Sequence, residues 1–280
     1  MDNKKNVKLA SQMVNPTYIT QGINALSARH NLVTNLLSQR RMPENGWDDA
    51  TIEYLLAQLA MMDSNNFTAN VGVGEREARI YSNLVTRRMY HLGHGIGRSG
   101  DVTAVQPKAA GSSLIVQISQ AMMLNLIKLS GILNTKKCLI LPCATGMSLA
   151  LTMLTLKSTI VKANPGLVDK KKYVIWNRID QKACFKSIIT AGFVPIVVEN
   201  ILIGDELTTN LEKIVETIET YGKDEILCVM STTSCFAPRA CDNVEEISKI
   251  CKKFDVGHII NNVCFSFTTS PHLPRSYYII

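Results

Sequence analysis

No Cys-x-x-Cys pair occurs in this sequence, although it contains eight cysteines. Most of them lie inside apolar segments, which favours buried thiols in a reducing compartment over disulfides or a zinc site. No uninterrupted apolar run reaches the ~18 residues that span a bilayer, and no signal-type hydrophobic stretch follows residues 1–5. We therefore expect a cytoplasmic protein with no metal site and no membrane-spanning segment.

Acidic residues are fewer than basic ones. The chain has 23 Asp and Glu against 30 Lys and Arg, so its net charge is +7 and its pI is near 9.0. A polyanionic partner such as RNA would suit this charge. The basic pairs are scattered along the chain, however, and a solvated surface explains each of them at least as well as a phosphate contact.

The first part of the chain combines helical patterns with a glycine-rich region. Apolar residues at helical spacing predict an N-terminal helical extension within residues 1–45, and Asp48 or Asp49 can cap a second helix. Between Val71 and Ser112, seven glycines are interleaved with arginines and a lysine. This composition predicts backbone and side-chain donors that are suited to anions.

From Ser113 onward, short apolar runs alternate with segments long enough to be helices. The predicted strands are 138–141, 173–176, 194–198, 226–230 and 256–260. The predicted helices between and beside them are 146–156, 180–191, 205–221 and 242–254. At the start of the last predicted helix, Asp242 and Glu245 have capping-box spacing. The segment 161–172 contains a proline, a glycine and three consecutive lysines, and it is predicted to be an exposed loop. The alternation predicts an α/β fold whose mainly parallel sheet has helices on both faces and an active site at the carboxyl ends of its strands.

One glycine motif fits a dinucleotide-binding pattern. Residues 95–100 read G-I-G-R-S-G, but no buried strand precedes them and no apolar helix follows. A loop that binds phosphate through its N–H groups, Arg98 and Ser99 is a better account, and Gln106 and Lys108 extend the donors. A flexible surface loop with incidental charges is an equal alternative.

Two further polar sites follow predicted strands. Residues 144–148 open a helix, so that they form either a phosphate seat or an ordinary helix cap. Asn261 and Asn262 end the fifth predicted strand, where they either meet a ring nitrogen of a cofactor or form a turn. His94 and His258 lack the spacing of metal ligands or of a catalytic triad, which favours core or surface histidines. Residues 231–234 follow a predicted strand and either line the site or form a hydroxyl-rich turn.

Eight stretches together resemble one family more closely than any single motif does. They are residues 43–48, 62–67, 72–77, 94–101, 106–113, 144–148, 178–182 and 231–239. The chain resembles the O-phosphoseryl-tRNA(Sec) selenium transferases, which are fold-type-I enzymes that depend on pyridoxal 5'-phosphate. The likeness runs from about residue 13 to residue 263 and is lost after that.

The resemblance implies a domain organisation and a reaction. Residues 46–263 would be an incomplete large domain of a fold-type-I transferase, residues 1–45 a tetramer-forming extension, and residues 264–280 an unrelated tail. Family members act on phosphoserine attached to tRNA(Sec), eliminate its phosphate and add selenium from selenophosphate to make selenocysteinyl-tRNA(Sec). The implied protein is a cytoplasmic homotetramer that binds tRNA.

The resemblance also assigns residues to the site. Those that would bind the cofactor are Arg76, Ala144, Thr145, Gln181 and Asn261. Those that would bind the substrate are Glu75, Arg98, Ser99, Gln106 and Lys108, where Glu75 would repel the free carboxylate of phosphoserine that is not attached to tRNA.

The family's lysine, which holds the cofactor as a Schiff base, would lie downstream of Asn262. Residues 263–280 contain no lysine and resemble nothing in the family. We therefore hypothesise a frameshift, a retained intron or a wrong gene model near the Val263 codon. We expect a product without catalytic activity, whose truncated sheet has exposed apolar faces and an unpaired edge. The alternatives are a noncatalytic fragment that binds tRNA or another subunit, and a different fold-type-I enzyme such as a cysteine desulfurase relative.

Overall fold

The computed structural model describes residues 4–69, 80–93, 101–179, 181–233, 239–262 and 277–279. The chain forms two compact units. One comprises Met1–Lys128 with Thr135–Ile140, and the other comprises Leu129–Asn134 with Leu141–Ile280. The domain boundaries expected after residues 45 and 263 stay a prediction.

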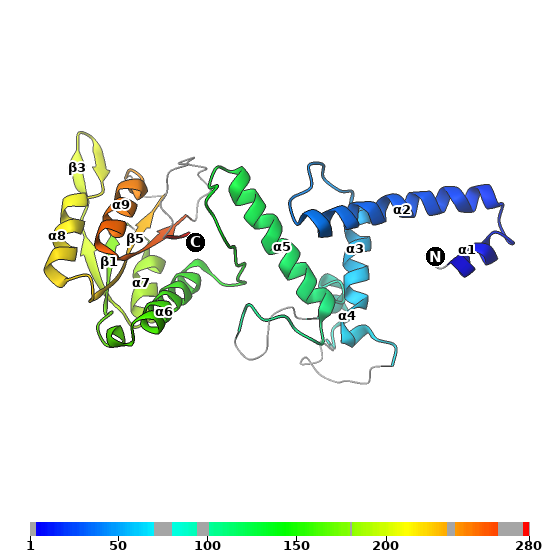
Figure 1. The fold of residues 1–280 in the computed structure, drawn as a ribbon, viewed down its shortest axis with the longest axis horizontal. Coiled ribbons are helices and arrows are strands. Elements are labelled where there is room, and N and C mark those ends of the chain that lie inside the picture. Colours follow the sequence, from blue (N-terminus) through cyan, green and yellow to red (C-terminus); the bar gives the residue numbers. More distant parts are fainter. Residues whose placement is uncertain are drawn as a thin grey trace. The chain divides into compact units, whose positions relative to one another are not determined.

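The first unit is helical where it is described. Its elements are α1 (Lys4–Ala10), α2 (Pro16–Gln39), α3 (Asp49–Met61), η1 (Ser64–Asn66), α4 (Asn83–Arg88) and α5 (Ala110–Leu129) (Figure 1). The helix α2 confirms the predicted N-terminal helix, and Pro16 at its first position supplies a preformed helical φ. Asp48 caps α3, because its carboxylate accepts the N–H of Thr51 at 2.7 Å.

The helix α5 is long and apolar enough to cross a membrane by length and composition, and no other helix in the described ranges passes that test. Its first turn nevertheless packs closely within the first unit. A Cβ atom on Gly111 would stand 1.8 Å from the carbonyl oxygen of Leu59 in α3. Only glycine therefore allows α5 to approach α3 this closely.

The second unit is built on a parallel sheet with the strand order β2-β1-β5-β6-β7. Its strands are β1 (Tyr173–Asn177), β2 (Val194–Val198), β5 (Ile226–Thr232), β6 (Gly257–Asn261) and β7 (Tyr277–Ile279). Its helices are α6 (Thr145–Ala163), η3 (Pro165–Leu167), α7 (Lys182–Thr190), α8 (Leu211–Tyr221) and α9 (Val244–Phe254). Four of the five predicted strands and the four predicted helices are thus present, although α6 extends to Ala163 and α8 begins only at Leu211.

Helices cover both faces of this sheet, as the alternation predicts (Figure 1). On one face, Met153 of α6 and Ile188 of α7 are fully buried against β1, β5 and β6. On the other face, Ile214 of α8 and Ile247 of α9 are fully buried against β1, β2 and β5. Burying both faces explains why the strands read as continuous apolar runs and lack an apolar-polar alternation.

The strand predicted at 138–141 is wrong, because this segment is extended chain without ladder pairing. A strand requires hydrogen bonds from a neighbouring strand, and none of the described strands pairs with it. The strand β7 pairs with β6 in parallel from His258 to Ile260, so that β7 is the edge of the described sheet on this side, and the predicted unpaired edge stays a prediction. The segment 205–221 forms a helix only in part, because residues 206–208 make strand β4 (Glu206–Thr208) in a hairpin with β3 (Ile201–Ile203).

The segment predicted as an exposed loop, 161–172, is partly helical and contains a buried lysine. The helix α6 continues to Ala163, η3 follows, and Lys171 is only 4% exposed. The Lys171 ammonium donates to the carbonyl oxygens of Lys223 at 2.7 Å and of Ile226 at 2.8 Å. Removal from water lowers the pKa of Lys171, and the two carbonyls offset part of that desolvation.

Candidate functional site

Asn261 ends β6 and lies at the centre of a small polar cluster. Its side-chain nitrogen Nδ2 donates to Gln181 Oε1 at 3.1 Å and to Cys184 Sγ at 2.9 Å. The Cys184 thiol in turn donates to Gln181 Oε1 at 3.3 Å. Two predicted site residues that are 80 positions apart in the sequence therefore touch, and they are joined by a cysteine that the sequence did not single out.

The second polar atom of Asn261 has no such partner. The residue is 1% exposed, and its oxygen Oδ1 forms no hydrogen bond with any described group. A buried carbonyl oxygen without a donor costs about 1–3 kcal/mol, so that such an atom calls for an explanation. A ligand that brings an N–H group to this oxygen would remove the cost.

The start of α6 lies next to the start of α7. A Cβ atom on Gly146 would stand 3.6 Å from the backbone oxygen of Ala183, which is an ordinary contact distance. Ala144 is the residue before α6, and no side chain caps the helix. The first turn, which begins at Thr145, therefore offers backbone N–H groups and the positive end of a helix dipole to an anion.

The carboxyl ends of β5 and β6 are tied together by hydroxyl groups. The Thr232 hydroxyl and the Thr233 N–H both donate to the Asn261 carbonyl oxygen at 3.1 Å. The Thr233 hydroxyl also donates to the Asn262 side chain. Thr232 and Thr233 therefore hold the strand end that carries Asn261. The prediction that residues 231–234 line the site stays a prediction, and Ser234 lies outside the described residues.

A buried ion pair, which was not predicted from the sequence, also holds the end of β5. Asp242 and Arg239 have side chains only 0% and 3% exposed and form a salt bridge. Asp242 also accepts the Thr232 N–H at 2.7 Å and the Thr209 hydroxyl at 2.5 Å, while Arg239 donates to the Arg178 carbonyl at 2.8 Å. The predicted capping role of Asp242 is therefore wrong, and its neighbour Asn243 caps α9.

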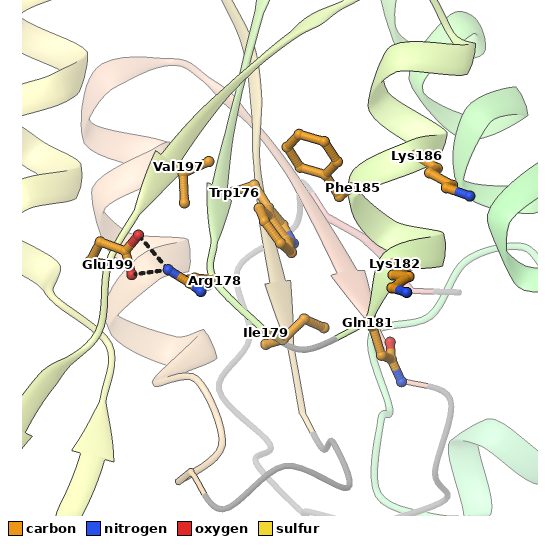
Figure 2. Close-up of a pocket in the computed structure, with 9 residues that line it drawn as sticks. All are labelled: Trp176, Arg178, Ile179, Gln181, Lys182, Phe185, Lys186, Val197 and Glu199. Atoms are coloured by element: carbon orange, nitrogen blue, oxygen red, sulfur yellow. Dashed lines mark hydrogen bonds and ion pairs between the residues drawn. The ribbon is translucent and has the colours of Figure 1, made fainter.

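A cavity of about 530 Å³ opens beside Gln181 (Figure 2). It is lined by Trp176, Arg178, Ile179, Gln181, Lys182, Phe185, Lys186, Val197 and Glu199. Arg178 forms an ion pair with Glu199, in which its Nη1 donates to both carboxylate oxygens, at 2.8 and 3.0 Å. Two lysines of α7 supply the remaining positive charge, so the cavity has a basic wall next to the Gln181 amide.

In the first unit, the backbone around Gln106 and Lys108 is held in place. The Gln106 N–H donates to Ser113 Oγ at 2.8 Å, and the Lys108 carbonyl accepts the Ser64 N–H at 2.8 Å. The Asp63 carboxylate is fully buried and accepts the N–H groups of Ser112 at 3.0 Å and of Gly93 at 2.7 Å. No role in the site was predicted for Asp63 from the sequence, although it lies in the stretch 62–67 that contributes to the resemblance.

Four predicted site residues lie outside the described residues. They are Glu75, Arg76, Arg98 and Ser99, and the glycine motif 95–100 and His94 lie there too. Their placement in the site stays a prediction.

The described cysteines are free thiols, and three of them, Cys184, Cys228 and Cys251, are buried. Cys138 is half-buried, and Cys143 and Cys241 are exposed. The expected burial therefore holds for three of the six described thiols. Among the residues that the structure describes, no group of three His, Cys, Asp or Glu side chains is placed to hold a metal.

The sequence model of the O-phosphoseryl-tRNA(Sec) selenium transferases matches residues 62–267. The chain belongs to this family. The selenium transferase of Dictyostelium discoideum is 52% identical over 262 residues, which are 93% of this chain and 53% of that protein. The enzyme of Caenorhabditis elegans is 46% identical over 233 residues, or 82% of this chain and 47% of that protein.

A solved structure agrees with these relatives. The crystal structure of an archaeal O-phosphoseryl-tRNA(Sec) selenium transferase superposes with a TM-score of 0.74 and 30% identity, over 89% of this chain and 55% of that chain. This match confirms the predicted fold class, a fold-type-I transferase with a parallel sheet between helices. The chain spans about half the length of the curated relatives it matches.

Proposed function

We propose that this chain carries the cofactor-binding and phosphate-binding part of an enzyme that converts O-phosphoseryl-tRNA(Sec) to selenocysteinyl-tRNA(Sec) with selenophosphate. The observation that carries the proposal is the cluster of Asn261, Gln181 and Cys184, which leaves Asn261 Oδ1 buried without a donor. Membership in the selenium transferase family supports this reaction over that of a cysteine desulfurase relative.

The described residues fit pyridoxal 5'-phosphate. Asn261 Oδ1 would accept the N–H of the protonated pyridine ring, and the Gln181 amide would meet the ring's polar edge. The first turn of α6, at Ala144 and Thr145, would bind the phosphate group through backbone N–H groups, and Arg76 would contact the cofactor as well. Bound in this way, the cofactor supplies the electron sink that elimination from phosphoserine requires.

The substrate phosphate would be bound by side chains that come before α5 in the chain. We assign Arg98, Ser99, Gln106 and Lys108 to it, and each charge-assisted hydrogen bond would contribute about 1.5–3 kcal/mol. Asp63 supports this region, because its carboxylate holds Gly93 directly before the segment 94–100. Glu75 would repel the carboxylate of free phosphoserine, so that only the form esterified to tRNA binds well.

The remaining parts of the proposal concern partners and assembly. The net charge of +7 supports binding of tRNA(Sec). We also propose that residues 1–45 form an oligomerisation extension to a large domain at 46–263, with 264–280 as a separate tail, in a cytoplasmic homotetramer.

Ligand binding by the purified chain tests the cofactor site. Pyridoxamine 5'-phosphate is the suitable probe, because its amine cannot form imines with surface lysines. We expect saturable binding by isothermal titration calorimetry, weakened about tenfold or more in Asn261→Ala, since loss of one hydrogen bond to a charged group costs about 1.5–3 kcal/mol. The matched control is Asn243→Ala, the same chemical change at the cap of α9.

Binding of tRNA(Sec) at two salt concentrations tests the second partner. We expect an affinity that falls steeply with salt, because basic side chains displace counterions from the phosphates. Salt-dependent tRNA binding without any binding of the probe would instead support a noncatalytic tRNA-binding module. Absence of both would refute the proposed function.

A further inference from the structure

We propose that Cys184 is a positioning residue that fixes the amide orientation of Asn261, so that Asn261 presents its carbonyl oxygen to the ring nitrogen of the bound cofactor. The inference rests on the proposed function for the identity of that ligand. It concerns a side chain of α7 that would lie behind Asn261 and Gln181 and would not itself touch the cofactor.

The hydrogen bonds of the cluster have a definite direction. A thiol has one proton to donate, and Cys184 donates it to Gln181 Oε1 at 3.3 Å. The sulfur lone pairs then accept from Asn261 Nδ2 at 2.9 Å, while the same amide nitrogen also donates to Gln181 Oε1 at 3.1 Å. The Asn261 amide group is therefore directed toward two acceptors.

Rotation of the Asn261 amide by half a turn would be unfavourable. Its oxygen would then face Gln181 Oε1, and two carbonyl oxygens repel each other at hydrogen-bond distance. Its nitrogen would lose both acceptors, and because Asn261 is only 1% exposed, water does not replace them. With Gln181 in the amide orientation that it has in the structure, the cluster thus favours one of the two orientations of Asn261.

The protonated thiol is the form that this arrangement requires. Burial raises the pKa of Cys184 to about 11, so that the proton stays on sulfur at neutral pH. With the proton present, Gln181 Oε1 accepts two hydrogen bonds, and the Gln181 amide nitrogen is left as the donor beside the cavity that this residue lines (Figure 2). One thiol thereby orders both amides.

The orientation has a chemical consequence for a bound pyridine ring. With its nitrogen engaged, Asn261 offers only Oδ1, which is buried and without a partner among the described groups. A carbonyl oxygen accepts from a protonated ring nitrogen and repels the lone pair of an unprotonated one. Cys184 would therefore raise the pKa of the ring nitrogen indirectly, and a freely rotating Asn261 would adapt to either form.

The test compares Cys184→Ala, Cys184→Ser and the control Cys251→Ala, which removes an equally buried thiol from the opposite face of the sheet. Each is titrated with pyridoxamine 5'-phosphate, and the ring-nitrogen pKa of the bound probe is measured from its ultraviolet spectrum against pH. In Cys184→Ala we expect binding about five- to tenfold weaker, as for one lost hydrogen bond, and a pKa shifted toward that of the free probe. Cys184→Ser, whose hydroxyl donates and accepts, should restore both values.

A second measurement uses the chain without ligand. In nitrogen-15 spectra, the Asn261 side-chain amide should exchange slowly with water in the wild type, in Cys184→Ser and in Cys251→Ala, and rapidly in Cys184→Ala. An unchanged Asn261 signal in Cys184→Ala, or an unchanged spectrum of the bound probe, would overturn the role of Cys184. If the wild type does not bind the probe at all, the proposed function fails, whereas the amide exchange still decides the positioning role.

Discussion

The buried histidine of β6 should make the stability of this protein depend on pH. His258 is 1% exposed, and its ring nitrogens Nε2 and Nδ1 are hydrogen-bonded to the hydroxyl groups of Ser231 at 2.7 Å and of Ser248 at 2.9 Å. Both partners are neutral hydroxyl groups, so that neither compensates a positive charge on the ring. Burial accordingly lowers the pKa of His258 from 6.5 to about 4.

The sign and size of the effect follow from proton linkage. Between pH 6.5 and about 4, the unfolded chain binds a proton at His258 that the folded chain does not bind. The stability is therefore fully present above pH 6.5 and is lost progressively as the pH falls toward 4. Since one pKa unit corresponds to about 1.4 kcal/mol, the whole shift amounts to about 3 kcal/mol of unfolding free energy.

Urea unfolding of the wild type and of His258→Gln, followed by circular dichroism from about pH 7 to about pH 4.5, measures this contribution. Glutamine can still bond to the serine hydroxyls but does not titrate, and the carboxylates titrate equally in both proteins. We expect the wild type to lose about 2–3 kcal/mol more than the variant over this range. Equal losses, or a His258 ring that gains its proton near pH 6.5 in proton spectra of the folded chain, would refute the reasoning.

Four further substitutions test packing and buried charge. Gly111→Ala should cost about 1–3 kcal/mol in urea unfolding, because its Cβ would overlap the backbone of α3. Gly22→Ala, where the added Cβ meets nothing within 4 Å, should instead stabilise α2 by up to about 1 kcal/mol, and a similar loss at both glycines would contradict the packing argument. Asp242→Ala should cost about 3–5 kcal/mol, because it leaves the Arg239 guanidinium buried without its anion. Glu216→Ala, which breaks an exposed ion pair, should change the unfolding free energy by less than about 1 kcal/mol, and an equal effect of the two acidic substitutions would count against the buried pair.

Local patterns in the sequence were enough to predict most of the helices and strands of the second unit. Apolar runs and helical periodicity are properties of neighbouring residues, and so they predicted β1, β2, β5, β6 and the helices between them. The same reasoning failed at 138–141, where an apolar run lacks the neighbouring strand that would pair with it. Pairing depends on residues distant in the chain and cannot be seen in the run itself.

The hydrogen-bond and ion-pair partners of buried polar groups could not be predicted from the sequence either. Lys171 belongs to a run of three lysines that predicts solvent, yet two backbone carbonyls from 52 and 55 residues away hold its ammonium inside the fold. Asp242 has capping-box spacing, yet its carboxylate is engaged by β5 and Arg239. In both cases a distant donor or acceptor competes with the local motif and prevails.

The sequence by itself determined the family and the parallel α/β architecture, and through the resemblance it predicted Gln181 and Asn261 as residues of one site. Only the tertiary structure decided that these two amides meet through Cys184, which is 77 residues from Asn261, and that Asn261 keeps one buried oxygen without a donor. Hydrophobic periodicity is a property of residues that are close in the sequence. The hydrogen bonds among Asn261 Nδ2, Cys184 Sγ and Gln181 Oε1 form only when β6 and the start of α7 pack side by side.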